Sequence, residues 1–275
     1  MSLFCDVEMA ARLERLEADL MGRSSEAARN GFAVPLAGGV ASFAEADSPL
    51  NKVAGLGFGG VPAAADLDAV EQAFFARGSA VQAEVSTLAD PAVGEVLSGR
   101  GYRLVSFENV SGCRPTAGAG TTYDIEVRSA TGEGEWLDVV ADAFAVADTQ
   151  GVASHEDFPR DVVVNAMRHM AAAGLRHYLA LRDGVPAGGA SMHVAGGVAQ
   201  LTGAATLPEH RRRGVQSALL SARLADAAAE GCDLAVVTTQ PGSKSQQNVQ
   251  RNGFDLLYAR AILVKPLPER DGNRG

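Results

Sequence analysis

The sequence predicts a mixed α/β fold made of two tandem halves. Within its 275 residues, runs that alternate like strands repeatedly give way to runs with apolar residues at helical spacing. In both halves a glycine-containing turn is followed by a helix, a strand, a short helix and a glycine before an aromatic residue. This series covers residues 60–101 in the first half and 214–253 in the second, which are nearly the same length. The shared order indicates a degenerate repeat of one fold.

The N-terminal half should begin with a helix, because Leu13, Leu16 and Leu20 stripe one face of the first segment. Further helices are expected at residues 64–77 and 91–99, the second with a proline in its first turn. Short strands separate these helices in a glycine-rich arrangement. They are expected at residues 31–36, 38–44, 51–58, 80–86 and 102–107.

The sequence GLGFGG at residues 55–60 satisfies the G-x-G-x-x-G pattern of dinucleotide-binding folds. In those folds the third glycine opens the following helix. Here Pro62 and three alanines separate Gly60 from the helical pattern, although Glu84 lies near the distance expected for the ribose-binding acid. A loop of small residues is the simpler interpretation. An NAD(P)-binding oxidoreductase is the least favoured class of function.

Residues 112–122, GCRPTAGAGTT, are small, polar and rich in turn formers, which indicates a connector. We therefore expect a first domain at residues 1–112, a linker at 113–122 and a second domain at 123–275. Helices of the second domain are expected at 135–147, 158–173, 214–229 and after the capping residue Ser243. Its strands are expected at residues 123–128, 176–182, 187–195, 198–206, 234–239 and 256–264.

The turn between the strand 198–206 and the next helix has the chemistry of an anion site. Residues 210–213 are His-Arg-Arg-Arg, and Gly214 follows them before the helical pattern begins. The first amides of a helix have no intrahelical partner and lie at the positive end of its dipole. A glycine lets a phosphate approach them where a Cβ would obstruct it. The stretch predicts a pyrophosphate site, and a solvated charge run is the alternative.

The pattern Arg211-x-x-Gly214-x-Gln216 resembles the coenzyme A signature of the GNAT-type N-acetyltransferase superfamily. Its last position departs from the family pattern, because Gln216 stands where a small residue is usual. The order of strand, turn, helix, strand, short helix and Gly253-Phe254 also matches the family's core over roughly the last 150 residues. The resemblance implies two tandem GNAT-like domains, each a mixed, mostly antiparallel twisted sheet flanked by helices. The first domain would lack the cofactor motif.

The resemblance further implies acetyl-CoA as the co-substrate, with no metal. The backbone of Thr206 and Leu207 would hold the pantetheine arm. The amides of residues 212–217 would hold the pyrophosphate, and the arginines would add positive charge. The cofactor-binding residues predicted in this way are Thr206, Leu207, Arg211, Arg212, Arg213, Gly214, Val215, Gln216 and Ser217.

Acyl transfer to an amine needs a group that deprotonates the amine and one that assists the departing thiolate. The family's usual acid is a tyrosine four residues before the glycine of Gly253-Phe254, and Val249 occupies that position. Ser245, one helical turn earlier, is the predicted substitute. Glu209, acting through water, and His193 are further catalytic candidates. Their simpler interpretations are an exposed turn residue and a packed histidine.

Composition restricts the partners. The chain has 33 Asp and Glu against 24 Lys and Arg, a net charge of −9, which argues against nucleic acid as the main partner. No signal-peptide pattern or membrane-length apolar run is present, so we expect a cytoplasmic protein with no membrane partner. Cys5, Cys113 and Cys232 are scattered, without metal-ligand spacing. A homodimer is left open.

The leading hypothesis is an acyl-CoA-dependent N-acyltransferase that passes an acetyl group to a primary amine by direct attack. The alternative is a non-catalytic acyl-CoA-binding or regulatory module. It is favoured by Val249 and by the lack of a carboxylate on the strand 198–206, because two usual catalytic groups are then missing. No sequence feature indicates which amine is the acceptor.

Overall fold

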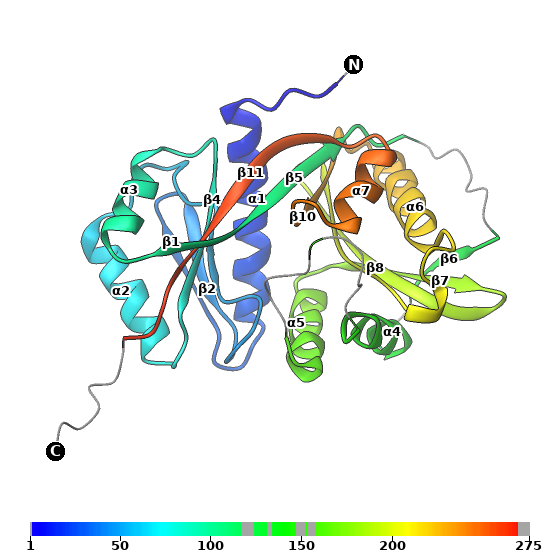
Figure 1. Cartoon of the computed structure of the whole chain (residues 1–275), viewed down its shortest axis with the longest axis horizontal. Coiled ribbons are helices and arrows are strands. Elements are labelled where there is room, and N and C mark those ends of the chain that lie inside the picture. Colours follow the sequence, from blue (N-terminus) through cyan, green and yellow to red (C-terminus); the bar gives the residue numbers. More distant parts are fainter. Residues whose placement is uncertain (1, 117–123, 131–133, 147–151, 153–157, 269–275) are drawn as a thin grey trace. The chain divides into compact units, whose positions relative to one another are not determined.

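The computed structural model describes residues 2–116, 124–130, 134–146, 152 and 158–268 of the chain (Figure 1). These residues form two compact units. The N-terminal unit contains residues 6–106 and the chain from 260 onward, and the C-terminal unit contains residues 1–5 and 107–259. Helices and mostly antiparallel strands build both units, so the predicted mixed α/β class is confirmed.

The sheet of the N-terminal unit has the order β1-β2-β3-β4-β11. Its pairs are antiparallel except for β3 and β4, which are parallel where Val53 lies opposite Ala83. The strand β5 (Arg103–Cys113) begins in this unit and β11 (Asp255–Lys265) ends in it. The other elements are α1 (Val7–Glu26), β1 (Phe32–Leu36), β2 (Gly39–Phe43), β3 (Lys52–Ala54), α2 (Ala64–Phe75), β4 (Val81–Ser86) and α3 (Ala92–Gly99).

Three aromatic rings organise the core of the N-terminal unit. Phe32 and Phe43 stack with their ring centroids 5.7 Å apart, across the pairing of β1 with β2. Phe74 of α2 meets both rings edge-on, at 5.6 and 5.8 Å. This contact explains the apolar spacing in α2, because Phe74 lies on the face that the helix buries against the sheet.

The GLGFGG stretch forms turns between β3 and α2, and α2 begins only at Ala64. A Cβ on Gly59 would lie 2.7 Å from the Cα of Gly38, so backbone packing accounts for glycine at that position. The sheet around it is mostly antiparallel, whereas dinucleotide-binding folds have a parallel sheet. The dinucleotide interpretation does not fit this fold.

Buried charges tie the end of β11 into the N-terminal unit. Arg260 donates from Nε to Glu14 Oε1 at 2.7 Å, and its Nη1 lies 3.5 Å from Glu84 Oε2. Lys52 Nζ lies 2.5 Å from Glu84 Oε1. Burial alone would raise the pKa of Glu84, but Lys52 and Arg260 outweigh it, and the pKa lies below its usual value.

The sheet of the C-terminal unit has the order β11-β5-β10-β9-β8-β7-β6. β9 and β10 are parallel, as the strand–helix–strand pattern predicted. The neighbouring pairs from β9 to β6, and β10 with β5, are antiparallel. The remaining elements are β6 (Glu126–Ser129), α4 (Gly134–Phe144), α5 (Arg160–Ala172), β7 (Arg176–Arg182), β8 (Val185–Ala195), β9 (Val198–Thr206), α6 (Val215–Ala229), β10 (Leu234–Thr239) and α7 (Lys244–Arg251).

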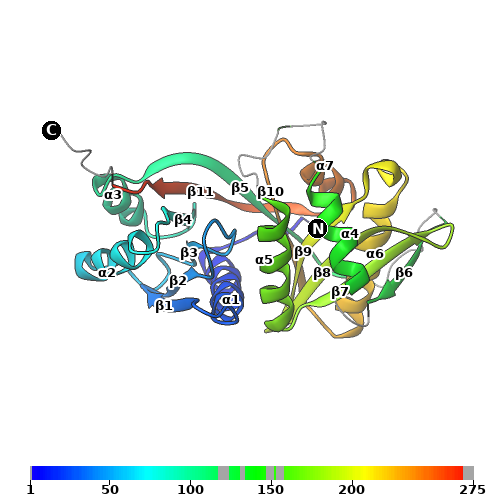
Figure 2. The same cartoon turned by 90° about the horizontal axis from the view of Figure 1, so that it is seen from below.

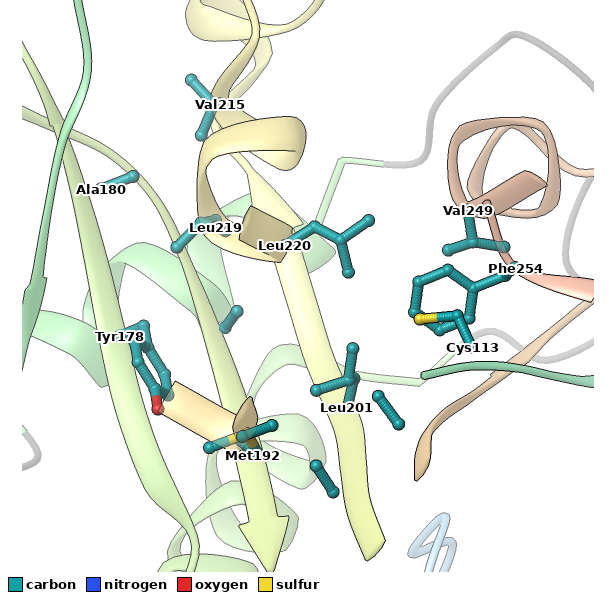
Figure 3. Packing of buried hydrophobic residues seen from close by; sticks show 14 of the residues in the cluster. Cys113, Tyr178, Ala180, Met192, Leu201, Val215, Leu219, Leu220, Val249 and Phe254 are labelled. Atoms are coloured by element: carbon teal, nitrogen blue, oxygen red, sulfur yellow. The ribbon is translucent and has the colours of Figure 1, made fainter. Parts of the chain in front are cut away.

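Helices cover both faces of the C-terminal sheet (Figure 2). On one face Trp136 of α4 stacks on His177 of β7, with centroids 3.8 Å apart. On the other face Leu219 of α6 packs in a cluster with Tyr178 and Met192 (Figure 3). His177 and Tyr178 are neighbours on one strand, so their side chains point to opposite faces. α4 and α6 therefore lie on opposite sides of the sheet.

Three expected strands differ from the structure by three residues or more at one end. The strand expected at 51–58 is only Lys52–Ala54, because the glycines after it turn the chain. The strand expected at 123–128 is Glu126–Ser129. β5 continues to Cys113, beyond the expected end at residue 107, because its later residues pair with β10. None of the described helices is both long enough and apolar enough to cross a membrane.

The structural units differ in their limits from the predicted division at 113–122. Residues 112 and 113 belong to β5, and residues 117–122 of the expected linker lie outside the described part of the chain. The last strand also changes unit, since Arg260 to Lys265 pair with β4. Local composition gives no signal for a partner that lies about 180 positions away in the sequence.

We expect Glu71→Gln to destabilise the N-terminal unit by about 1–3 kcal/mol at neutral pH. Burial alone would raise the pKa of Glu71, but hydrogen bonds from Arg100 and Lys265 outweigh it, and the pKa lies below the ordinary 4.5. Stability from these bonds is therefore full above pH 4.5 and is lost as the pH falls through the folded-state pKa. Urea unfolding at neutral and acidic pH measures both effects.

The matched control is Asp68→Asn, since the exposed Asp68 carboxylate contacts the same Arg100. We expect a change of about 0–1 kcal/mol for this exposed pair. Two results would contradict the assignment. One is an equal loss of unfolding free energy in both variants, and the other is a decrease of stability at acidic pH that is the same in Glu71→Gln as in the parent.

Candidate functional site

The predicted anion turn lies between β9 and α6. β9 ends at Thr206, a 3₁₀ turn covers Pro208–His210, and α6 begins at Val215. Gly214 precedes the helix with a φ of 87°, in the left-handed region that glycine favours. No side chain of the described residues caps this helix, and its first turn has no acidic residue. The first amides of α6 are thus available to an external acceptor.

Arg211 points its guanidinium into the protein. Its Nε donates to the Thr206 carbonyl at 3.2 Å. Its Nη2 donates to the carbonyl of Ala143, at 3.3 Å, and to that of Val146. The first arginine of the signature therefore joins the turn to the end of α4. Its role as a phosphate contact stays a prediction, and these bonds show that it also has a structural role.

Arg212 and Arg213 are exposed, unlike Arg211. Arg212 adopts a φ of 62°, a left-handed conformation that is rare outside glycine and costs about 1–2 kcal/mol. Two left-handed residues, Arg212 and Gly214, thus lie within three positions and curl the backbone before the helix. The two exposed guanidinium groups give this curl a positive charge on a chain whose net charge is −9.

Gln216 occupies the position where the signature usually has a small residue. Its Nε2 donates to Thr206 Oγ1 at 3.2 Å, at the end of β9. This bond draws the side chain toward the strand. The structure thus shows how a long side chain is accommodated in the first turn of α6.

β9 and β10 separate along their length. Their parallel pairing ends where Leu201 lies opposite Val237. β9 continues to Thr206 and β10 to Thr239, but the described residues show no further pair between them. The last residues of β9 therefore have an open backbone edge toward β10. We refer to this opening as the strand gap.

A bulge in β9 coincides with the strand gap. In the pairing with β8, Gly203 and Ala204 together lie opposite Ala190 alone. Gly203 has a φ of 60°. A bulge of this kind bends the strand and increases its twist. We attribute the separation of β9 from β10 to this extra residue.

Side chains from both faces of the sheet hold the bulge. Arg223 of α6 is 3% exposed, and its Nη1 donates to the carbonyls of Ser191, at 3.0 Å, and Thr202, at 3.4 Å. Burial lowers the pKa of Arg223 to about 10. From the opposite face, Trp136 Nε1 donates to the Ala190 carbonyl at 3.2 Å. The bulge thus lies between two buried donors.

The helix α7 begins as predicted, because Ser243 Oγ accepts a hydrogen bond from the Gln246 amide at 3.1 Å. Ser245 is exposed in the first turn of this helix. Val249 is 4% exposed and packs with Phe254 in the apolar cluster (Figure 3). The valine that replaces the expected tyrosine therefore serves the core, and the role of Ser245 stays a prediction.

The other catalytic candidates lie on separate elements. His193 of β8 is 5% exposed, and its Nδ1 lies 3.0 Å from Gln200 Oε1. This pairing matches the interpretation as a packed, hydrogen-bonded histidine. Glu209 is exposed in the 3₁₀ turn. The structure brings the predicted cofactor residues and Glu209 into the turn between β9 and α6. It places His193 on β8 and Ser245 on α7.

Three features of this site were not predicted from the sequence: the bulge, the buried Arg223 and the buried end of β10 at Thr239. A signal existed for the first, since a glycine inside a strand pattern marks a bulge or close approach. Arg223 had no such signal, because an arginine in an amphipathic helix ordinarily lies in solvent. Among the described residues, no group of three or more His, Cys, Asp or Glu is placed to hold a metal ion.

Comparisons with known proteins agree with this geometry. Residues 141–254 match the family model described as the acetyltransferase (GNAT) family. No curated protein matches the sequence. A solved GCN5-related N-acetyltransferase from Kribbella flavida is 20% identical, with a TM-score of 0.67 over 94% of this chain and 96% of that one. A tandem GNAT protein from the clavulanic acid biosynthesis pathway is 14% identical, with a TM-score of 0.58 over 97% and 98%.

At these sequence identities the structural similarity shows the fold alone. The family is assigned from the family model, for the residues that the model covers. Over residues 141–254, this match confirms the family predicted from the coenzyme A signature.

We expect Gly203→Ala to destabilise the protein by about 1–2 kcal/mol, because alanine is strained at a φ of 60°. The added Cβ would meet its nearest neighbour, Ser191 Oγ, at an ordinary 3.4 Å, so backbone strain is the main cause. Urea unfolding measures the loss. Gly94→Ala in α3, with no neighbour within 4 Å, should instead stabilise by about 0.5–1 kcal/mol. An unchanged free energy of unfolding in Gly203→Ala would argue against the left-handed conformation at the bulge.

Proposed function

We propose that the chain is an acyl-CoA-dependent N-acyltransferase, since residues 141–254 match the model of the acetyltransferase (GNAT) family. Acetyl-CoA is the first candidate donor and a primary amine the acceptor. The observation that supports this most is the uncapped start of α6 behind Gly214, directly after the open edge of β9. An anion-binding helix start beside an open strand edge suits a ligand with a pyrophosphate and an extended amide-containing arm.

The pyrophosphate would bind the amides of residues 212–217. Arg212 and Arg213 are exposed there and would add charge-assisted contacts. Arg211 is committed to carbonyls of Thr206 and α4, so its part in this proposal is to hold the turn in place. Electrostatic attraction toward this turn would draw a polyanionic cofactor to an otherwise acidic chain.

The pantetheine arm would lie in the strand gap. Leu207 N already donates to the Ala187 carbonyl at 3.0 Å, so its amide is not available to the arm. The open edge of β9 between Leu201 and Thr206 offers backbone groups that β10 does not pair. An extended arm with two amides could hydrogen-bond there as an added strand does. The thioester would then lie near the bulge at Gly203.

In the reaction the amine nitrogen attacks the thioester carbonyl, and the carbon–sulfur bond breaks as the amide forms. A backbone amide at the strand gap would stabilise the oxyanion. A primary amine is mostly protonated at neutral pH, so a base or a water path must remove a proton. Glu209 is exposed and His193 is buried against Gln200, so of the two only Glu209 could meet water directly.

A non-catalytic acyl-CoA-binding module is the second candidate. The observation that favours it is Val249, a buried apolar residue where the family's thiolate acid usually lies. The strand β9 also has no carboxylate. Catalysis remains the leading proposal, because a thiol is a fair leaving group near neutral pH without a strong acid.

The test combines calorimetric titration with CoA and acetyl-CoA and thiol release across a panel of primary amines. Binding with thiol release for at least one amine would support the transferase. Tight binding with no release for any amine would favour the module. Absence of binding to either ligand would contradict the whole proposal.

Gly214→Asp and Gly214→Asn form a matched pair at the helix start. Both variants place a side chain at a φ of 87°, and we expect a similar loss of stability, about 1 kcal/mol, from this shared strain. Only aspartate places a negative charge against the cofactor phosphates. We expect Gly214→Asp to bind CoA at least tenfold more weakly than Gly214→Asn, about 1.4 kcal/mol. Equal affinities in calorimetry would show that the phosphates bind elsewhere.

We also propose that the N-terminal unit is a degenerate GNAT-like domain that binds no cofactor. Its counterpart turn, residues 55–63, contains no arginine or lysine, and Asp66 lies in the first turn of α2. A carboxylate at that helix start repels phosphate. We expect calorimetry to give one CoA per chain. Val61 is an exposed residue of the counterpart turn, so Val61→Asp should leave CoA affinity unchanged. A second bound CoA, or weaker CoA binding by Val61→Asp, would contradict the proposal.

A further inference from the structure

Thr239, the last residue of β10, has a hydroxyl that the described fold does not use. The residue is 5% exposed, and its Oγ1 has no hydrogen-bond partner among the described residues. Burying a hydroxyl without a partner costs about 1–3 kcal/mol. An unpaired buried polar group in a native fold therefore requires an explanation, and a ligand that supplies the missing partner is one.

Thr239 borders the strand gap. On one side its backbone pairs with β5, opposite Asn109. On the other side, the register that sets Leu201 opposite Val237 would set Gly203 opposite Thr239. The pairing has ended before that point, and Gly203 is the left-handed residue of the bulge. The unpaired hydroxyl thus belongs to the strand end that faces the bulge across the gap.

The side chain of Thr239 projects to the face that α6 and α7 cover. Val237, two residues earlier, packs against the apolar cluster. Figure 3 shows Leu201 and Val249 in this cluster. Residues two apart on a strand share a face. Thr239 therefore offers its hydroxyl on the same side of the sheet as Val249, where a thiolate acid was expected and a valine is found.

We propose that Thr239 is a catalytic residue whose hydroxyl donates a hydrogen bond to the sulfur of the acyl-CoA thioester. This inference rests on the proposed function. As the amine nitrogen bonds to the carbonyl carbon, the carbon–sulfur bond breaks and the sulfur leaves with the electron pair. The proton of the nitrogen passes to water, and the thiolate takes a proton from solvent.

The Thr239 hydroxyl transfers no proton in this scheme. It stabilises the charge that builds up on sulfur, and hydrogen bonds to a charged acceptor are stronger than those to a neutral one. The bond should therefore be stronger in the transition state than in the bound thioester. An interaction of this kind raises kcat more than it raises affinity.

Thr239→Val tests the proposal, because it keeps the shape of the side chain and removes the hydroxyl. We expect kcat for thiol release to fall about tenfold or more, with KM for acetyl-CoA nearly unchanged. Thr239→Ser should recover most of kcat. We expect unfolding by urea to show equal or higher stability for Thr239→Val, since an unpaired buried hydroxyl is removed.

Binding supplies a second readout that a structural role would not move. CoA and desulfo-CoA differ only at the sulfur, so the ratio of their affinities reports contacts to that atom. We expect the parent protein to prefer CoA over desulfo-CoA, and we expect this preference to be smaller in Thr239→Val. The affinity for desulfo-CoA should be the same in both proteins. An unchanged kcat together with an unchanged preference would overturn the inference.

Two controls separate this residue from its neighbours. Thr238→Val changes the adjacent, exposed threonine on the opposite face and should leave both readouts unchanged. Ser245→Ala tests the exposed hydroxyl predicted from the sequence. Loss of kcat in Ser245→Ala but not in Thr239→Val would overturn the inference and favour Ser245. A parent protein that binds no CoA would overturn the proposed function itself, so the two failures are distinguishable.

Discussion

The site depends on one extra residue in β9. A regular strand would continue its parallel pairing with β10 to the end of the sheet and leave no open edge between them. With Gly203 and Ala204 opposite a single residue of β8, the strand instead leaves β10 after Leu201. The turn before α6 directly follows β9 in the chain, so the open edge and the uncapped helix start lie next to each other.

Buried polar groups stabilise this irregular geometry from both faces. Taking the guanidinium of Arg223 out of water opposes folding, as the lowered pKa indicates. In return, two carbonyls beside the bulge gain a donor, and Trp136 supplies another from the opposite face. Because both donors lie on helices packed against the sheet, the strand gap exists before any ligand arrives. A ligand would therefore spend little of its binding energy on separating the strands.

Local patterns in the sequence predicted the elements that local interactions determine. The bounds of β7, β9 and β10 agree with the prediction to the residue, because alternation and nearby glycines or prolines mark the ends of each strand. The anion turn was predicted for the same reason. The bulge was not, since small residues around Gly203 leave the alternation indistinct. The buried Arg223 and the unpaired hydroxyl of Thr239 depend on neighbours far along the chain, which periodicity does not report.

The last strand of the N-terminal unit has a consequence for how the protein is made. β4 receives its second neighbouring strand from Arg260–Lys265. Glu14 accepts a hydrogen bond from Arg260, and Glu71 accepts one of its hydrogen bonds from Lys265. During synthesis residues 260–265 leave the ribosome after every other strand of the described residues has been made. The sheet formed by the first hundred residues is therefore complete only after residues 260–265 have been translated. Domains generally fold in the order of their synthesis, so this order is unusual. The N-terminal unit therefore completes its sheet only after residues 107–259 of the C-terminal unit have been translated.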